Sequence, residues 1–132
     1  VDISVESLGL HEVDVGEVHF IQKRMSSTFH DERPLSQFIA ALDEGSLDPM
    51  NLPNKIRVVD WPGQGLVTLD HRRLYCLKEH ARRTKQTVFT MAHKYRFPKE
   101  FEHLVNSHPI FIECMRKFYK ASGSLIPKAR SW

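Results

Sequence analysis

The sequence has little cysteine and no long hydrophobic run. Its 132 residues contain two cysteines, without the CxxC spacing that is typical of zinc and redox sites. No segment approaches the roughly 20 consecutive apolar residues that a membrane-spanning helix needs. Residues 1–10 show no basic leader followed by an apolar run. We therefore expect neither a membrane span nor a signal peptide, and a cytoplasmic site of action.

Several catalytic signatures are missing as well. The chain has no GxxxxGK(S/T) loop, no GxGxxG turn, no GxSxG elbow and no HExxH pair. Their absence argues against P-loop NTPases, Rossmann-type enzymes and α/β-hydrolases. The eight histidines do not form a two-His, two-Cys arrangement, so a zinc site is not expected. Cys76 and Cys114 lie among apolar residues and are expected to be buried thiols.

The composition is that of one ordinary globular domain. The chain is 41% hydrophobic and 27% charged, which argues against disorder and against disulfide-dense scaffolds. Its length allows one core, so we expect a single domain over residues 1–132. The formal net charge is +3 and the pI is about 9.0, a mild basic excess that gives weak support to a polyanionic partner.

The first half of the chain predicts a strand, a helix and a connector. Loose alternation predicts a strand over residues 13–21. Asp48–Asn54 contains two prolines and is expected to be a connector. Between them, apolar residues at helical spacing predict an amphipathic helix that starts near Pro34 and stops at Gly45: Leu35, Phe38, Ile39 and Leu42.

The second half predicts a hairpin followed by a helix. Two β-branched runs, Ile56–Val59 and Leu66–Leu69, flank the turn-forming residues Trp61–Gly65. Asp70 is the expected N-cap of a helix, and the apolar pattern of that helix consists of Leu74, Leu77 and Ala81. Another strand is predicted over residues 87–91. Two helices are predicted after Pro98, one through Phe101, Leu104 and Val105 and one from Ile110 to Phe118.

The start of the helix after Asp70 has an unusual charge pattern. The first turn of a helix exposes unpaired N–H groups and the positive end of the helix dipole, so it attracts anions. Here it carries His71, Arg72 and Arg73, at a cost of a few tenths to about 1 kcal/mol that a bound polyanion would reverse. The structural alternative is that Arg72 pairs with Asp70 or Asp60 while Arg73 points to solvent. The pattern favours a phosphate-binding helix start.

This segment resembles a known superfamily. Residues 56–77, IRVVDWPGQGLVTLDHRRLYCL, look like the core of the ParB/sulfiredoxin superfamily. Leu69-Asp70-His71-Arg72 stands where sulfiredoxins have Gly-Cys-His-Arg and ParB proteins have Gly-Glu-Arg-Arg. The resemblance covers roughly residues 13–92. It implies an α+β fold, a small mixed sheet covered by helices, to which residues 98–121 add a C-terminal helical extension.

The resemblance also implies roles for the residues of this motif. His71 and Arg72 are expected to contact nucleotide phosphates, as the equivalent positions do in family members that bind ATP or CTP. Asp70 replaces the sulfiredoxin cysteine, which excludes reduction of a sulfinic acid. For Asp70, capping the helix, holding a metal ion and acting as a base all remain open.

Further polar residues are weaker candidates. The loop after the first predicted strand holds possible phosphate contacts, with a solvated loop as the alternative: Gln22, Lys23, Arg24, Ser26 and Ser27. The acidic candidates for a metal ligand or general base are Glu17, Glu32 and Asp60. The basic run of His80, Arg82, Arg83 and Lys85 is expected to be a solvated helix end, and it would suit nucleic acid only if it shared a face with Arg57, Arg72 and Arg73.

These observations predict phosphate-ester chemistry on nucleic acid by a ParB-like nuclease domain. In this hypothesis Arg57, Arg72 and Arg73 bind phosphate, His71 transfers a proton, and Asp70 orients His71 or holds a divalent metal ion. The alternatives are ATP- or CTP-dependent phosphotransfer or a nucleotide-binding switch, and a non-enzymatic DNA-binding module. The cofactor is open, with Mg²⁺ and a nucleoside triphosphate as candidates. The size and charge also fit the toxic module of a larger effector, which would have a cognate inhibitor.

Overall fold

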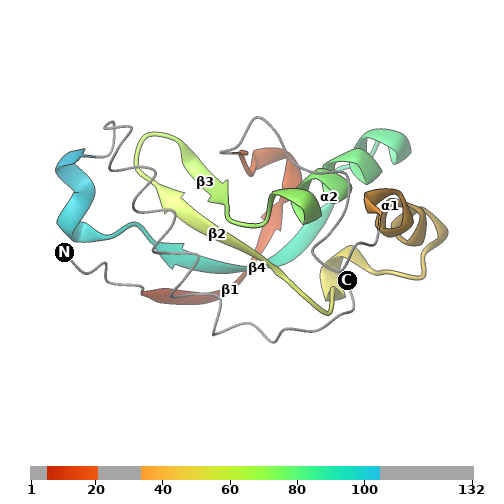
Figure 1. Cartoon of the computed structure of the whole chain (residues 1–132), viewed down its shortest axis with the longest axis horizontal. Helices are drawn as coiled ribbons and strands as arrows, with labels where there is room; N and C mark the ends of the chain where they lie inside the picture. The colour runs from red at the N-terminus through yellow and green to blue at the C-terminus, as the bar shows by residue number, and fades with distance from the viewer. Residues whose placement is uncertain (1–5, 21–33, 105–132) are drawn as a thin grey trace.

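The computed structural model describes residues 6–20 and 34–104, which form an α+β unit with a four-stranded mixed sheet and two helices (Figure 1). The helices and strands follow one another as β1 (Ser7–Asp14), α1 (Leu35–Glu44), β2 (Ile56–Trp61), β3 (Gly65–Thr68), α2 (His71–Thr84) and β4 (Phe89–Arg96). Short 3-10 helices cover Val15–Glu17, Pro49–Asn51 and Lys99–Leu104. The predicted α+β class is thereby confirmed, and no more specific fold is established.

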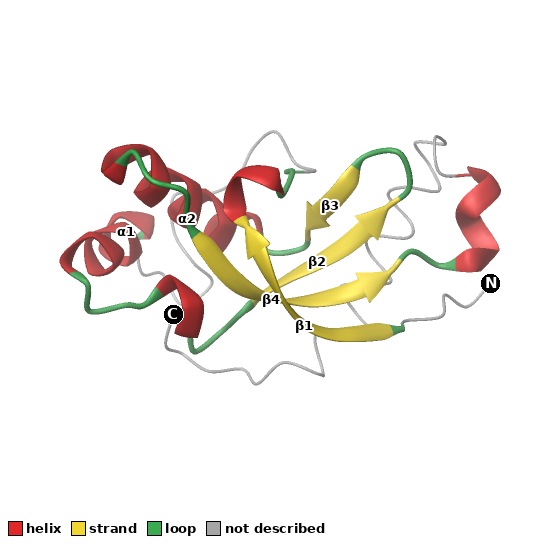
Figure 2. Cartoon of the chain, turned by 180° about the vertical axis from the view of Figure 1, so that it is seen from behind, coloured by secondary structure: helices red, strands yellow, loops and turns green. Residues whose placement is uncertain are grey.

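The strands are ordered β1-β4-β2-β3 across the sheet (Figure 2). β4 pairs antiparallel with β1 and parallel with β2, and β2 pairs antiparallel with β3. Parallel pairing of β2 with β4 requires a crossover connection, which is supplied by β3 and α2. In this register Arg57 of β2 lies beside His93 of β4, although the two residues are far apart in the sequence.

The hydrophobic core lies between one face of the sheet and the two helices. Ile56 and Val58 of β2 and Ala92 of β4 pack there against buried residues of α1 and α2. Cys76 of α2 is fully buried, and its thiol contacts the carbonyl oxygen of Leu35 at 3.7 Å. The predicted buried thiol is confirmed for Cys76, whereas Cys114 lies outside the described residues.

Local sequence accounts for α1 and for the hairpin, and both predictions are confirmed. α1 begins directly after Pro34 and buries the four predicted apolar residues. It ends at Gly45, whose φ of 81° is a left-handed conformation that glycine adopts without steric cost. The turn between β2 and β3 is closed by the N–H of Gln64, which donates to the carbonyl oxygen of Trp61 at 3.0 Å. The connector at residues 48–54 contains one 3-10 turn.

Three element predictions need correction. The strand predicted at 13–21 lies at Ser7–Asp14, because Asp14 accepts a hydrogen bond from the N–H of Gly16 at 2.8 Å and starts a 3-10 helix instead. The strand predicted at 87–91 runs from Phe89 to Arg96. The first helix predicted after Pro98 is a 3-10 helix, Lys99–Leu104, where described, and the second lies outside the described residues.

Candidate functional site

The candidate site lies at the corner where β3 leads into α2. The N–H of Leu69 donates to the carbonyl oxygen of Arg57 at 2.9 Å and continues the strand pairing past the end of β3. The N–H of Asp70 donates to the hydroxyl oxygen of Thr68 at 2.9 Å, and the first helical hydrogen bond runs from the N–H of Leu74 to the carbonyl oxygen of Asp70 at 3.1 Å. The corner is therefore hydrogen-bonded on both sides of Asp70.

Asp70 forms a buried ion pair with Arg57. Arg57 Nε donates to Asp70 Oδ2 at 3.0 Å, Arg57 Nη2 donates to Oδ1 at 2.8 Å, and the Arg57 backbone N–H donates to Oδ2 at 2.8 Å. The two side chains are only 9% and 8% exposed. Bidentate, charge-assisted bonds of this kind are roughly twice as strong as neutral ones.

This ion pair corrects the predicted capping role of the Asp70 side chain. Asp70 occupies the N-cap position of α2 as predicted, but its side chain makes no capping hydrogen bond. Both carboxylate oxygens accept hydrogen bonds from Arg57, so the carboxylate holds β2 and the start of α2 together. The carboxylate also acts on His71, because burial lowers the pKa of the imidazole and the negative charge of Asp70 opposes that shift. The Arg57 guanidinium holds Asp70, and its predicted contact with phosphate stays a prediction.

Arg72 and Arg73 remain at the positive end of α2. Arg73 Nη1 lies 3.5 Å from Asp70 Oδ1, so Arg73 shares the carboxylate that Arg57 already binds. The predicted structural alternative placed Arg73 in solvent, whereas its guanidinium lies beside Asp70 and its side chain is 23% exposed. The first turn of α2 contains no acidic residue. The guanidinium groups of Arg57 and Arg73 therefore share one carboxylate at the positive end of the helix dipole.

His71 is the first residue of α2 and is 6% exposed. Its ring stacks against the ring of Phe20, with centroids 6.2 Å apart and planes at 21°. Burial lowers the pKa of His71 below its ordinary value, against the opposing effect of the Asp70 carboxylate. Lys78 Nζ, two turns further along α2, lies 5.5 Å from the centroid of the same Phe20 ring. Burial therefore favours the neutral form of the imidazole, and one side of the ring lies against an aromatic ring.

His93 belongs to the surroundings of this ion pair and was missed in the sequence. It lies beside Arg57 on the sheet, and burial lowers its pKa, with Lys55 and Arg57 acting in the same direction and Asp70 in the opposite one. Tyr95, two residues along β4, is buried, and its burial raises the pKa of the phenol. No motif marks these residues, because only the pairing of β2 with β4 brings them to Arg57.

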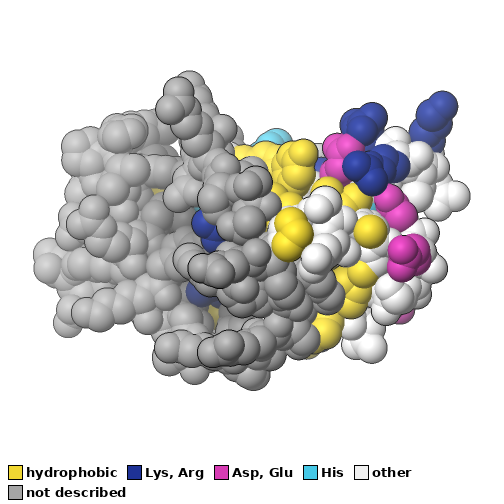
Figure 3. All heavy atoms as spheres, turned by 45° about the vertical axis from the view of Figure 1, so that its right-hand side comes forward, with side chains coloured by type: hydrophobic (Ala, Val, Ile, Leu, Met, Phe, Trp, Pro, Cys, Tyr) yellow, Lys and Arg dark blue, Asp and Glu magenta, His cyan; other side chains and the backbone are white. Residues whose placement is uncertain are grey.

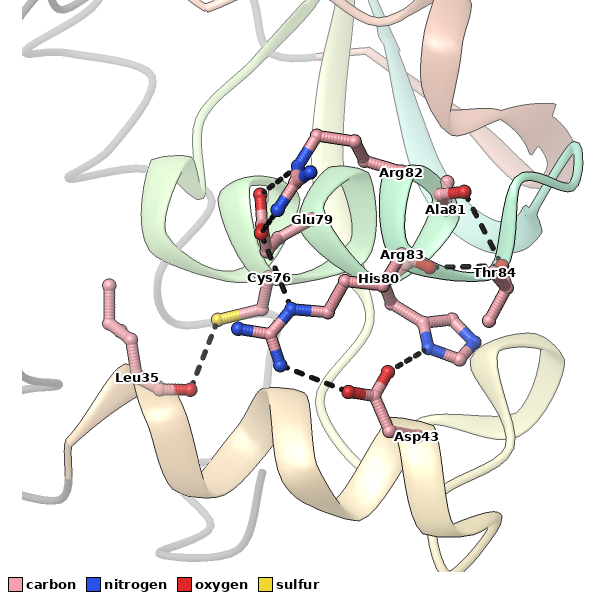
Figure 4. A network of polar contacts seen from close by, with 9 residues as sticks. All are labelled: Leu35, Asp43, Cys76, Glu79, His80, Ala81, Arg82, Arg83 and Thr84. Atoms are coloured by element: carbon pink, nitrogen blue, oxygen red, sulfur yellow. Dashed lines mark hydrogen bonds and ion pairs between the residues drawn. The ribbon is translucent and has the colours of Figure 1, made fainter.

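The predicted basic run at the end of α2 is largely matched by acidic residues. Asp43 of α1 lies between two residues of α2, 2.7 Å from His80 Nδ1 and 3.1 Å from Arg83 Nη1 (Figure 4). Arg82 and Arg83 both bind Glu79. The hydrogen bond from His80 lowers the pKa of Asp43, and the one from Arg82 lowers the pKa of Glu79.

In the space-filling view, Lys and Arg side chains lie beside Asp and Glu side chains on the part of the molecule formed by α1 and α2 (Figure 3). The predicted solvated helix end is confirmed for Arg82, Arg83 and Lys85, which are exposed, and a network of ion pairs that Arg83 and His80 form with Asp43 also joins it to α1. Arg57 lies on the sheet and is bound to Asp70, so it takes no part in this network.

The remaining candidates are not brought to the corner in the part of the chain that is described. Glu17 and Asp60 are exposed, on the first 3-10 helix and on β2. Glu32 and the loop candidates Gln22, Lys23, Arg24, Ser26 and Ser27 lie outside the described residues. Among residues 6–20 and 34–104, no group of three or more His, Cys, Asp or Glu side chains could hold a metal ion. No helix among these residues is long and apolar enough to cross a membrane.

Comparison with protein-family models, with curated proteins and with solved structures found no match to this chain.

Proposed function

We propose that this domain acts on phosphodiesters of nucleic acid and that the β3–α2 corner binds the phosphate. As part of this proposal, the domain is related to ParB-like nuclease domains. It is supported by the order of the elements around Leu69–Arg72, where a helix, a hairpin and a second helix follow one another as that resemblance implies.

The excess of guanidinium groups at the start of α2 is the observation that carries this proposal. Cations in the first turn oppose the helix dipole, and each costs about 0.3–1 kcal/mol at an exposed site. The first turn of α2 contains no acidic residue, and Arg57 and Arg73 share the one carboxylate of Asp70 at its start. A bound phosphate would remove the conflict by accepting hydrogen bonds from the first N–H groups of α2 and by pairing with Arg72 and Arg73.

For cleavage, His71 is the residue that would accept a proton. Its lowered pKa keeps the imidazole neutral near pH 7, which is the form that a general base requires. Asp70 is assigned the role of a positioning residue, because it contacts Arg73 and holds the start of α2 on β2. We assign no described residue to Mg²⁺, since the carboxylate at the corner is bound by Arg57.

One observation favours a second candidate, a non-enzymatic nucleic-acid-binding module. His71 is 6% exposed and stacked under Phe20, which limits the access of a reacting group to its ring. This module would keep the phosphate-binding corner and would show no turnover.

A binding experiment tests the phosphate site. Arg72→Ala and Arg73→Ala should each weaken binding of a fluorescent oligonucleotide and together reduce the slope of log K against log salt by about 1.5–2. Arg96→Ala is the matched control, because Arg96 lies on β4, is 48% exposed and pairs with Glu6. Equal losses in all three variants would mean that binding depends on net charge alone and would refute a phosphate site at this corner.

A cleavage experiment separates the candidate functions. Plasmid DNA, RNA and each nucleoside triphosphate are incubated with the domain, with and without Mg²⁺. We expect strand cleavage that His71→Gln abolishes while the thermal unfolding midpoint and oligonucleotide affinity are retained. Hydrolysis of a nucleoside triphosphate, or transfer of its phosphoryl group, would support the phosphotransferase alternative. Binding of nucleic acid without cleavage would support the binding module. Cleavage that survives in His71→Gln would refute the role of His71.

A further inference from the structure

The outward face of α2 continues the positive charge of the corner along the helix. Arg72, Tyr75, Glu79 and Arg82 are spaced at i, i+3, i+7 and i+10, so they lie in one stripe on this helix. Tyr75 is 40% exposed and the Arg82 side chain is 71% exposed, whereas Leu74, Cys76 and Leu77 of the same helix are buried. The stripe therefore lies on the accessible side of α2.

Positive charges lie at both ends of this stripe and on both sides of it. Arg72 stands at its start and Arg82 at its end, and Lys78 and Arg83 flank it. Glu79 is the one acidic residue among these α2 positions and is bound by both Arg82 and Arg83, and Arg83 also pairs with Asp43 of α1. The Arg82 side chain is exposed in this pair, and exposed ion pairs contribute little in water. A phosphate group approaching from solvent can therefore bind Arg82 without a large loss.

The stripe is too long for a single phosphate group. Arg82 lies ten positions after Arg72, which corresponds to about 15 Å along an α-helix. One strand of duplex nucleic acid advances about 3.4 Å per phosphate, so this length matches about four phosphates. Tyr75 lies between the two arginines and offers an exposed aromatic surface of the kind on which bases stack.

We propose that the outward face of α2 binds several consecutive nucleotides of one nucleic-acid strand. The ligand class is thus a polynucleotide rather than a mononucleotide. This inference rests on the proposed phosphate site at the start of α2, and it adds Tyr75 and Arg82 to the residues that contact the ligand. The arginines contact phosphates and the Tyr75 ring contacts a base. Binding should therefore depend on the length of the nucleic-acid strand more than on its base sequence.

Competition binding against a labelled dodecamer tests this assignment. The competitors are the mononucleotide, dinucleotide, hexamer and dodecamer of deoxyadenylate and of adenylate, compared per mole of nucleotide. We expect the affinity per nucleotide to rise by about tenfold or more from dinucleotide to dodecamer. Tyr75→Ala and Arg82→Ala should each weaken dodecamer binding by about tenfold while leaving the dinucleotide unaffected, and Tyr75→Phe should restore binding because the ring is kept.

The outcomes separate this inference from the function on which it rests. If Arg72→Ala and Arg73→Ala weaken binding but Tyr75→Ala, Arg82→Ala and the control Arg96→Ala all bind the dodecamer as the wild type does, the face of α2 is not used and only the corner site stands. Equal affinity per nucleotide for all lengths would also overturn the inference. If Arg72→Ala and Arg73→Ala leave dodecamer binding unchanged, the proposed function itself fails.

Discussion

The buried ion pair between Arg57 and Asp70 makes a prediction about stability that can be tested without knowing the ligand. Asp70→Asn keeps an oxygen that can accept the Arg57 backbone N–H, but it removes the negative charge between two guanidinium groups. Both side chains are less than 10% exposed, so solvent screens them little. Removing one partner of such a pair leaves a buried charge uncompensated, at a cost of about 3–5 kcal/mol.

A double-mutant cycle measures how strongly the two residues are coupled. Arg57→Met should lower the free energy of unfolding by a similar amount. The buried Asp70 carboxylate then keeps only its backbone donor and the more distant Arg73. The double variant Arg57→Met/Asp70→Asn contains neither buried charge, so its loss should be smaller than the sum of the single losses by at least about 2 kcal/mol.

Urea unfolding monitored by circular dichroism gives these free energies from the midpoint and slope. The exposed pair of Arg96 and Glu6, with side chains 48% and 56% exposed, is the matched control. Arg96→Ala should change stability by no more than about 1 kcal/mol. Single losses at Arg57 and Asp70 as small as that of the control, or additive losses in the double variant, would show that the buried pair has no special strength and would refute the reasoning.

Three further predictions follow from local features. Burial lowers the pKa of His71 in the folded state below the unfolded value of about 6.5, so the folded protein binds fewer protons and loses stability as the pH falls from about 6.5 through the lowered folded pKa. The urea midpoint of His71→Gln should therefore fall less than that of the wild type between pH 7.5 and pH 5. Part of the fall remains in both proteins, because the pKa of His93 is lowered as well. Parallel plots of urea midpoint against pH would contradict the lowered pKa of His71. Burial raises the pKa of Cys76 to about 12, so iodoacetamide at pH 8 should label Cys76 only after unfolding, as read by peptide mass spectrometry; rapid labelling of the folded protein would show that the thiol is accessible. Lys85 ends α2 with a φ of 55°, so Lys85→Gly should raise stability by about 0.5–1 kcal/mol in urea unfolding, whereas a loss would mean that the lysine side chain contributes more than the relieved strain.

Most of the local elements around the site were predictable from the sequence, because short-range chemistry determines them. The spacing of Leu35, Phe38, Ile39 and Leu42 between Pro34 and Gly45 leaves little alternative to α1. The hairpin and the start of α2 at His71 follow from equally local signals. β1 was misplaced because its residues Ser7–Glu12 are mostly exposed at the edge of the described sheet and carry no strong alternation.

The contacts of the site residues were predicted less well. Asp70 was a reasonable N-cap from its position, since residues of its type favour that place. Its carboxylate instead binds Arg57, thirteen residues earlier, because the pairing of β2 with β3 brings a guanidinium and a backbone N–H within 3.0 Å of it. His93 gave no signal at all, and its place beside Arg57 depends on the parallel pairing of β2 with β4.

The sequence by itself determined where α1, the hairpin and α2 form and that cations gather at the start of α2, because periodicity, turn residues and helix ends act over a few neighbouring residues. Only the tertiary structure decided which charged residues form ion pairs and which ionisable groups are buried. Burial beside Arg57 strengthens the pairing of Asp70, burial lowers the pKa of His71, and the approach of α1 brings Asp43 to His80 and Arg83. Electrostatic interactions depend on distance in space and on exclusion of water, and neither can be read from the order of the residues.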